Sequence, residues 1–235
     1  MTELIYQTDS YAKEFTATVT GYAGEQNGVL LDRTAFYPGG GGQPNDVGQL
    51  VVDGRTYNVT SVVRGNIHIV EGELPPVGAA VTGILDWDRR YKLMRTHTAM
   101  HILCGVVWRD YSASVTGGNM EPLSGRMDFE FERMQKELVT EIETRINAEV
   151  QAARDIRVNI LPREEAFKIP DLIRTKINLL PEGIPEVRTV EIIGLDLQAD
   201  GGTHVANTRE VGTLRIADYK SKGGINKRIY LEINN

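Results

Sequence analysis

Cysteines, long apolar runs and signal-like segments are scarce or absent in the sequence, and each absence excludes a class of protein. It has one cysteine, Cys104, in 235 residues, which excludes an internal disulfide and fits a reducing compartment. No stretch approaches the roughly 18 to 20 consecutive apolar residues that a membrane-spanning helix needs. The N-terminal residues lack the basic segment and apolar run of a secretory signal. We therefore expect a cytoplasmic protein with neither a membrane nor a disulfide-linked partner.

The charged residues are acidic in sum but unevenly spread. Hydrophobic residues make up 41% of the chain and charged residues 25%, the composition of a globular protein that buries a core. The formal net charge of −6 argues against a nucleic-acid partner. Basic residues nevertheless gather in two strips, formed by Arg89, Arg90, Lys92 and Arg95 and by Arg215, Lys220, Lys222, Lys227 and Arg228. Such strips either neutralise phosphates or form a solvated face, and charge alone leaves both open.

The first 88 residues have the pattern of a small all-β domain. Short runs rich in β-branched or alternating apolar residues are separated by turn signals such as Asp53-Gly54 and Pro75-Pro76. These runs predict strands over 15–22, 28–31, 48–52, 57–63, 67–70 and 80–85. So many short strands in so few residues indicate a small barrel or sandwich.

Beyond residue 88 the pattern changes to mixed helices and strands. Apolar and histidine residues at three- and four-residue steps predict a helix over 90–108. Further spacing predicts helices over 134–153 and 164–167, strands over 156–161 and 187–193, and a hairpin of 212–219 with 228–233 turned at Gly223-Gly224. We therefore expect an α+β fold with two domains, 1–88 and 89–235.

Three of the four histidines lie in two short motifs that suit a metal ion. His97 and His101 are four residues apart, so on a helix they project from one face and can share a tetrahedral metal. Asp200 and His204 flank Gly-Gly-Thr, where two glycines let the backbone aim both side chains inward. Thr98 stands where zinc peptidases have a glutamate general base, which argues against a peptidase. Histidines on an apolar helix face are also common in cores, so the pair alone leaves metal binding open.

A second conspicuous segment runs over residues 34–48, with the sequence Thr-Ala-Phe-Tyr-Pro-Gly-Gly-Gly-Gly-Gln-Pro-Asn-Asp-Val-Gly. Four consecutive glycines can cradle a phosphate with their N–H groups. No Gly-Lys-Ser/Thr follows and no helix opens after them, which excludes a P-loop, and the dinucleotide-binding fingerprint is absent. Local composition by itself is equally typical of a flexible loop.

Taken in order, these motifs resemble the editing region of alanyl-tRNA synthetase. The glycine-rich segment, the histidine pair and Gly-Gly-Thr-His-Val are together similar to the free-standing alanyl-tRNA editing proteins called AlaX, in length to their medium-sized class. The resemblance extends from about Leu30 to Ile233. It implies a small glycine-rich β-barrel followed by an α/β editing core, and hydrolysis of the ester that joins serine or glycine to alanine tRNA.

The resemblance also implies a zinc cofactor, one ion per chain. His97, His101 and His204 match zinc-binding histidines of the family. Asp200 matches a position where many relatives have cysteine, and a carboxylate oxygen is a sound zinc ligand, so Asp200 is the candidate fourth ligand. Without a thiolate, the site should hold the metal less tightly or less selectively.

Substrate contacts follow from the same resemblance. Thr34 and Gln43 match residues near the amino-acid pocket, and Gly41 and Gly42 allow close backbone approach. We expect the Thr34 hydroxyl to bond the hydroxyl of serine, so that alanine is held poorly. Contacts with the tRNA are expected from the basic strips, at Arg89, Arg90, Lys220, Lys222, Lys227 and Arg228. The sequence shows no ATP-site motif, so we expect no charging activity, and it does not single out a catalytic group.

Two other functions share these features. One is a zinc hydrolase of a different ester or amide. The other is a tRNA-binding module without catalytic activity, in which the zinc is structural. A closed set of four protein ligands is typical of a structural zinc and an open position of a catalytic one, so Asp200 is the residue that discriminates.

Overall fold

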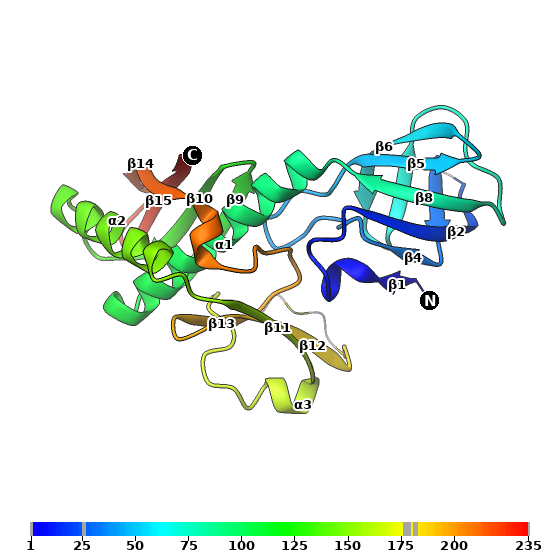
Figure 1. Cartoon of the computed structure of the whole chain (residues 1–235). Coiled ribbons are helices and arrows are strands. Elements are labelled where there is room, and N and C mark those ends of the chain that lie inside the picture. The colour runs from blue at the N-terminus through cyan, green and yellow to red at the C-terminus, as the bar shows by residue number, and fades with distance from the viewer. Residues whose placement is uncertain (1, 25–26, 176–179, 181–182, 235) are drawn as a thin grey trace. The chain divides into compact units, whose positions relative to one another are not determined.

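The computed structural model of the chain describes residues 2–24, 27–175, 180 and 183–234, and Figure 1 shows its elements. The chain divides into two compact units, Met1–Lys92 and Leu93–Asn235. The first unit therefore ends four residues beyond the predicted boundary, inside the first long helix.

The first unit is a closed β-barrel with a short additional strand pair. The barrel strands follow one another in the order β2-β3-β7-β6-β5-β8, and β1 pairs with β4 in parallel. The strands are β1 (Glu3–Leu4), β2 (Glu14–Ala23), β3 (Gly28–Leu31), β4 (Arg33–Thr34), β5 (Gly48–Val52), β6 (Arg55–Val63), β7 (Ile67–Val70) and β8 (Ala80–Leu85), and a 3₁₀ turn, η1, covers Ile5–Gln7.

Alternation of apolar and polar residues explains how the barrel closes on a core. Along β2 the side chains of Phe15, Ala17 and Val19 are buried, while the threonines between them face outward. Gly83 on the neighbouring strand β8 leaves room for the ring of Phe15, whose atoms would lie 2.4 Å from a Cβ there. The predicted barrel, and all six strands predicted for these residues, are confirmed.

The second unit combines helices with two antiparallel sheets. One sheet has the order β14-β15-β10-β9 and the other β11-β12-β13. The elements are α1 (Trp87–Tyr111, which begins in the first unit), β9 (Val115–Glu121), β10 (Ser124–Glu130), α2 (Lys136–Gln151), β11 (Ile156–Pro162), α3 (Arg163–Ala166), β12 (Glu186–Ile192), β13 (Asp196–Ala199), the 3₁₀ turn η2 (Thr208–Val211), β14 (Thr213–Ser221) and β15 (Asn226–Asn234).

Helix α1 lies between the two sheets of this unit. Met100 packs against Gly118 and Gly125 of the four-stranded sheet, with its sulfur 2.9 Å from the position of a Cβ at Gly125. On the other side Gly105 faces Leu195 and Asp196, where β13 begins. Between residues 93 and 107 only Arg95 is not buried, so the helix is a core element on all its faces.

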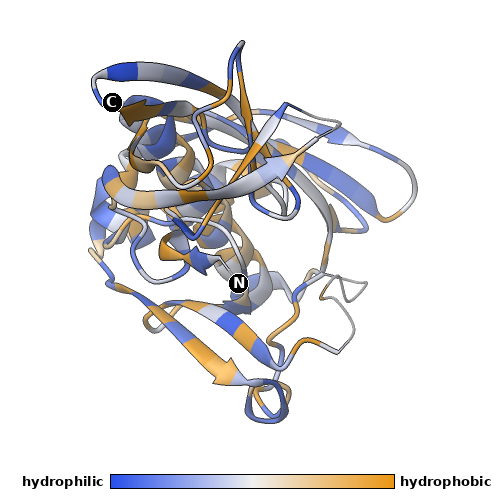
Figure 2. Ribbon diagram, turned by 90° about the vertical axis from the view of Figure 1, so that its right-hand side faces the viewer, coloured by the Kyte–Doolittle hydropathy of each residue, from blue (hydrophilic) through white to orange (hydrophobic). Residues whose placement is uncertain are grey.

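The remaining predictions for the second unit are confirmed in type, but three strands were not predicted. The helices over 90–108 and 134–153, the strands over 156–161 and 187–193, and the terminal hairpin all form. The sequence reasoning missed the hairpin β9–β10 and the short strand β13. In the part of the chain that the structure describes, no helix is long and apolar enough to cross a membrane. Figure 2 shows hydrophilic and hydrophobic residues interspersed along the ribbon.

Candidate metal centre

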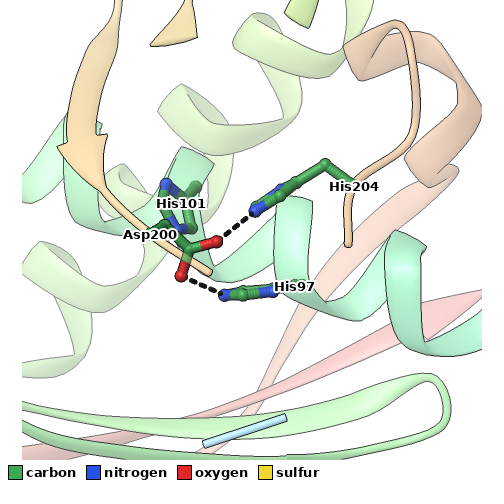
Figure 3. Close-up of side chains that lie close together, drawn as sticks. All are labelled: His97, His101, Asp200 and His204. Carbon is green, nitrogen blue, oxygen red and sulfur yellow. Dashed lines mark hydrogen bonds and ion pairs between the residues drawn. The ribbon is translucent and has the colours of Figure 1, made fainter. Parts of the chain in front are cut away.

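Four of the residues singled out in the sequence converge in the second unit. His97 and His101 project from one face of α1, as their four-residue spacing requires. Asp200 and His204 come from the loop between β13 and η2. Figure 3 shows the carboxylate of Asp200 among the three imidazole rings. The ring centroid of His204 lies 4.3 Å from that of His97 and 4.7 Å from that of His101.

The spacing of the donor atoms fits one tetrahedral ion. The Asp200 carboxylate places Oδ1 3.5 Å from His97 Nε2 and Oδ2 3.1 Å from His204 Nε2. Ligands at zinc distances of about 2.0 to 2.1 Å are separated by about 3.3 Å along a tetrahedron edge. All four donor atoms lie within 4.8 Å of one another, so small side-chain movements bring the set around a single ion.

Burial and neighbouring groups shift the pKa values of these donors toward the charge states that bind a cation. It lowers the pKa of His97 well below its ordinary value and that of His204 to about 4, so both imidazoles are neutral and keep a lone pair. Burial alone would raise the pKa of Asp200, but its contacts with the imidazoles, which include a hydrogen bond with His204, outweigh burial and hold that pKa well below its ordinary value. These three residues therefore offer two neutral nitrogens and a charged oxygen.

Neighbouring groups orient these side chains. The hydroxyl of Thr98 lies 3.1 Å from His204 Nδ1 and accepts from the backbone N–H of Val205. The carboxylate of Asp196 lies 3.1 Å from His101 Nδ1. Burial would lower the pKa of His101, but the hydrogen bond to Asp196 outweighs it and the pKa rises. The site thus includes polar residues beyond the four donors.

The loop that carries Asp200 is shaped by hydrogen bonds. Asp200 Oδ2 accepts from the backbone N–H of Gly202 at 2.7 Å, a tight turn closed by the aspartate side chain. Arg188 on β12 donates from Nη1 to the backbone carbonyl of Asp200 at 2.9 Å. Gly201 has no positive φ, and a Cβ there would meet nothing within 4 Å. The turn is therefore held by Asp200 itself, and the conformational freedom expected from the two glycines is not needed at position 201.

The glycine-rich segment is an ordered loop of the barrel unit. Gly39, Gly40, Gly41 and Gly42 have φ values of 80°, 136°, 56° and 88°, a run that side-chain-bearing residues rarely adopt. The loop is closed by hydrogen bonds in both directions between the backbones of Gly40 and Gln43. Gly41 is exposed, whereas Gln43 is buried. The glycines are therefore required by the backbone conformation.

Two buried side chains anchor this loop within the same unit. Asp46 accepts from the backbone N–H of Tyr37 at 2.6 Å and forms an ion pair with Arg90. The hydroxyl of Thr34 lies 2.8 Å from Nε2 of His68 and accepts from the backbone N–H of Phe36. Thr34 itself is fully buried.

The predicted tRNA contacts differ widely in exposure. Lys220 and Lys222 are exposed on the terminal hairpin. Arg228 is half-buried and paired with Asp128, and Arg89 is half-buried with Nη2 donating to the carbonyl of Asn45. Two of the six are buried, namely Arg90, and Lys227 with its ammonium group on the carbonyls of Gly223 and Gly224. A phosphate cannot reach these two in this conformation, because their charged groups are enclosed by the protein.

Comparison with known proteins finds family matches in both the first and the second part of the chain. Residues 5–89 match the family model described as tRNA synthetases class II (A), and residues 187–230 match the threonyl and alanyl tRNA synthetase second additional domain. The chain is 42% identical to the alanyl-tRNA editing protein AlaX-M of Saccharolobus solfataricus, with 99% of each chain covered. It is 37% identical to AlaX-M of Methanosarcina barkeri over the same shares.

The chain belongs to the AlaX-M family of alanyl-tRNA editing proteins. The resemblance found in the sequence motifs is thereby confirmed. The chain is also 39% identical to the alanine–tRNA ligase of Pyrobaculum aerophilum, over 91% of this chain but 25% of that protein. The chain thus matches about one quarter of that ligase.

Sequence reasoning missed three residues around the candidate metal centre. Asp196 and Arg188 lie in strands of the three-stranded sheet, and nothing in their local sequence distinguishes them from other charged strand residues. Gly105 gave a signal, because a glycine inside a long helix is costly and usually marks a close approach. Cys104 is buried, and Gln198 donates to its sulfur at 3.3 Å.

Proposed function

We propose that this chain is a zinc-dependent deacylase that acts in trans on mischarged alanine tRNA. It hydrolyses the ester that joins serine or glycine to the 3′ end of the tRNA. The observation that carries the proposal is the buried set of three imidazoles and one carboxylate in the second unit. Similarity to AlaX-M proteins along nearly the whole chain supports it. The single cysteine is consistent with activity in the cytoplasm.

In this proposal His97, His101 and His204 hold the ion, with Asp200 as the fourth ligand. When bound, zinc supplies a Lewis acid that polarises an ester carbonyl or makes a bound water more acidic. Thr98 takes no part as a base, because a hydroxyl is a poor one and this one is engaged with His204 and Val205. The chain's own contribution is to hold the labile ester in position and to exclude competing groups.

The glycine-rich segment is the proposed substrate-selecting element. Thr34 and Gln43 are buried in this conformation, so they would bond the amino acid only after the loop moves, and Gly41 and Gly42 would allow the backbone to approach it. For the tRNA itself, we propose contacts from Lys220, Lys222, Arg228 and Arg89, whose side chains are exposed or half-buried. We omit Arg90 and Lys227 because their charged groups are enclosed.

One observation favours a second candidate, a tRNA-binding module with a structural zinc. Four protein donors fill a tetrahedron, and closed four-ligand sites are typical of structural zinc. Catalysis would need an open position at the metal. Asp200 could free one, because a carboxylate shifts or leaves more readily than a thiolate.

The test combines zinc analysis with deacylation assays. Purified protein is incubated with seryl-, glycyl- and alanyl-tRNA(Ala), with and without a chelator. We expect about one equivalent of zinc, hydrolysis of the first two substrates, and loss of activity on chelation that added zinc restores. His101→Ala should lose most of the zinc, whereas His68→Gln, at the histidine outside the cluster, should retain it.

The alternatives predict different results in the same assay. Zinc without hydrolysis of any of the three tRNAs would support the structural role. Zinc with hydrolysis of simple esters but not of aminoacyl-tRNA would indicate another substrate. Equal zinc in wild type and His101→Ala would contradict the ligand assignment.

A further inference from the structure

Asp196 is a buried carboxylate that touches a proposed metal ligand without belonging to the ligand set. It is 4% exposed at the start of β13. Its Oδ2 lies 3.1 Å from His101 Nδ1 and accepts from Gln198 Nε2 at 2.7 Å. A carboxylate oxygen accepts hydrogen bonds and does not donate them. His101 Nδ1 therefore carries a proton in this contact, so Nε2 is the nitrogen that can face a metal.

We propose that Asp196 is a positioning residue, which holds His101 with Nδ1 protonated and Nε2 directed to the metal. The inference rests on the zinc site proposed above. A ligand histidine anchored through its other nitrogen loses rotational freedom and keeps one tautomer. His204 has a weaker restraint of this kind, because the Thr98 hydroxyl can either donate or accept. Only a group that cannot donate selects a single tautomer.

The position of Asp196 is supported from a second side by Arg174. The guanidinium Nε of Arg174 lies 3.5 Å from Asp196 Oδ1, and the side chain of Arg174 is 11% exposed. The same guanidinium lies 4.8 Å from the centroid of the Trp108 ring on α1. One carboxylate oxygen thus faces His101 while the other faces a cation, which keeps the carboxylate in one orientation.

Gly105 is the independent observation that supports this arrangement. It lies four residues after His101 on α1, directly under the start of β13. A Cβ at this position would lie 2.9 Å from Asp196 Cβ and 2.9 Å from Leu195 Cγ, closer than real side chains approach. Glycine costs a helix interior about 1 kcal/mol relative to alanine. The glycine avoids this clash and so allows Asp196 to reach His101, which offsets the cost to the helix.

The first test measures the tautomer of His101 in the zinc-loaded wild-type protein. Proton–nitrogen correlation spectra of the imidazole rings distinguish a proton on Nδ1 from one on Nε2. We expect the His101 ring to carry its proton on Nδ1 and to bind zinc through Nε2. A ring protonated on Nε2 would overturn the inference without the need for any variant.

The second test measures zinc affinity by competition with a chromophoric chelator. Asp196→Asn keeps the side-chain shape but places an amide N–H₂ among the donors of Gln198, Arg174 and His101. We expect zinc binding about 10- to 100-fold weaker than in wild type. Gly105→Ala should weaken it in the same direction while preserving helicity, which provides a second variant if Asp196→Asn folds poorly.

The matched control is Asp128→Asn. Asp128 is also buried in the second unit and paired with an arginine, but that arginine is Arg228, its partner in the four-stranded sheet. It should lose stability and keep wild-type zinc affinity. Wild-type zinc affinity in both Asp196→Asn and Gly105→Ala would overturn this inference and leave the proposed zinc site standing. A wild-type protein that binds no zinc would remove the proposed metal site, and this inference with it.

Discussion

The hydroxyl of Thr34 has one proton to donate, and within the barrel it already donates this proton to His68. His68 Nδ1 faces the carbonyl oxygen of Val29 at 3.2 Å, so this nitrogen carries the ring proton and Nε2 accepts from Thr34. Burial lowers the pKa of His68 to about 4, which keeps the ring neutral near pH 7. Thr34 can therefore meet a serine hydroxyl only as an acceptor, a role that serine's own proton permits.

Replacement of Thr34 by valine tests whether this hydroxyl selects the substrate. Thr34→Val preserves shape, and a substrate hydroxyl that loses its partner costs about 1 to 3 kcal/mol. Hydrolysis of seryl-tRNA should slow, and the serine-over-alanine ratio should narrow by roughly tenfold to a hundredfold. The measurement is that ratio under single turnover, with zinc content unchanged.

The ratio separates selection from stability. Thr34→Val also removes the bond to His68, so the barrel should lose about 1 kcal/mol of folding free energy whatever its role in the reaction. Thr20→Val, at an exposed position of β2, is the control for the substitution itself. An unchanged ratio would assign Thr34 to the barrel structure alone.

At the scale of elements, Glu149 connects the C-terminal ends of both long helices. It lies in the last turn of α2, and its oxygens accept from Arg109 of α1 at 2.5 Å and from Arg154 at 2.6 Å. Burial alone would raise the pKa of Glu149, but these two arginines outweigh it and lower the pKa below 4.5. The carboxylate therefore contributes stability while it is charged.

The depressed pKa predicts a pH-dependent loss of stability. Because the folded-state pKa lies below the unfolded value, the contribution is complete above about pH 4.5 and is lost as the pH falls through the folded pKa. Glu149→Gln should lower the free energy of unfolding at pH 7 by about 1 to 3 kcal/mol, with a smaller difference at acidic pH. Urea unfolding at several pH values measures both.

The same helix provides a control for this prediction. Glu141 pairs with Arg145 at 2.6 Å one turn apart, but its side chain is 48% exposed. Glu141→Gln should therefore change stability by no more than about 0.5 kcal/mol. If the two variants behave alike at pH 7 and at acidic pH, Glu149 does not stabilise the helix junction.

The elements differ in how well the sequence predicts them, for physical reasons. Strands such as Gly28–Leu31 and Ile67–Val70 were predicted with correct bounds because they are apolar and end at turns. Strand β9 was missed because Gly117, Gly118 and Asn119 have low strand propensity, and its conformation comes from pairing with β10. In β10, Met127 and Phe129 alternate with charged residues, a signal that was present and overlooked.

At the scale of the whole molecule, the net charge of −6 hides an exposed basic hairpin end. Lys220→Gln with Lys222→Gln removes two exposed charges of the terminal hairpin. If both lysines contact phosphates, tRNA binding should weaken and the slope of log affinity against log salt should fall by about two counterions. Filter binding or anisotropy at several salt concentrations measures this slope.

A matched variant separates local contacts from overall charge. Lys136→Gln with Lys168→Gln removes two other exposed lysines and gives the same net charge, −6 − 2 = −8. We expect its salt slope to equal that of wild type. Equal slopes in all three proteins would place the tRNA contacts elsewhere on the surface.

The candidate metal centre was predictable to the extent that its residues form local motifs. His97 and His101 share a helix face, and Asp200 and His204 share a loop, so spacing pointed to both halves. Their convergence needs α1 and β13 to pack together, which local sequence does not encode. Asp196 shows the limit most clearly, since it meets His101 across 95 positions of sequence.

The buried cysteine offers a way to measure how often the core around α1 opens. The thiol of Cys104 lies one turn beyond Met100 on α1, and burial raises its pKa well above the ordinary value. A thiol that is both enclosed and protonated reacts with alkylating reagents only when its surroundings open. Since the sequence has no other cysteine, the rate of labelling measures how often the helix that carries His97 and His101 is released from its packing.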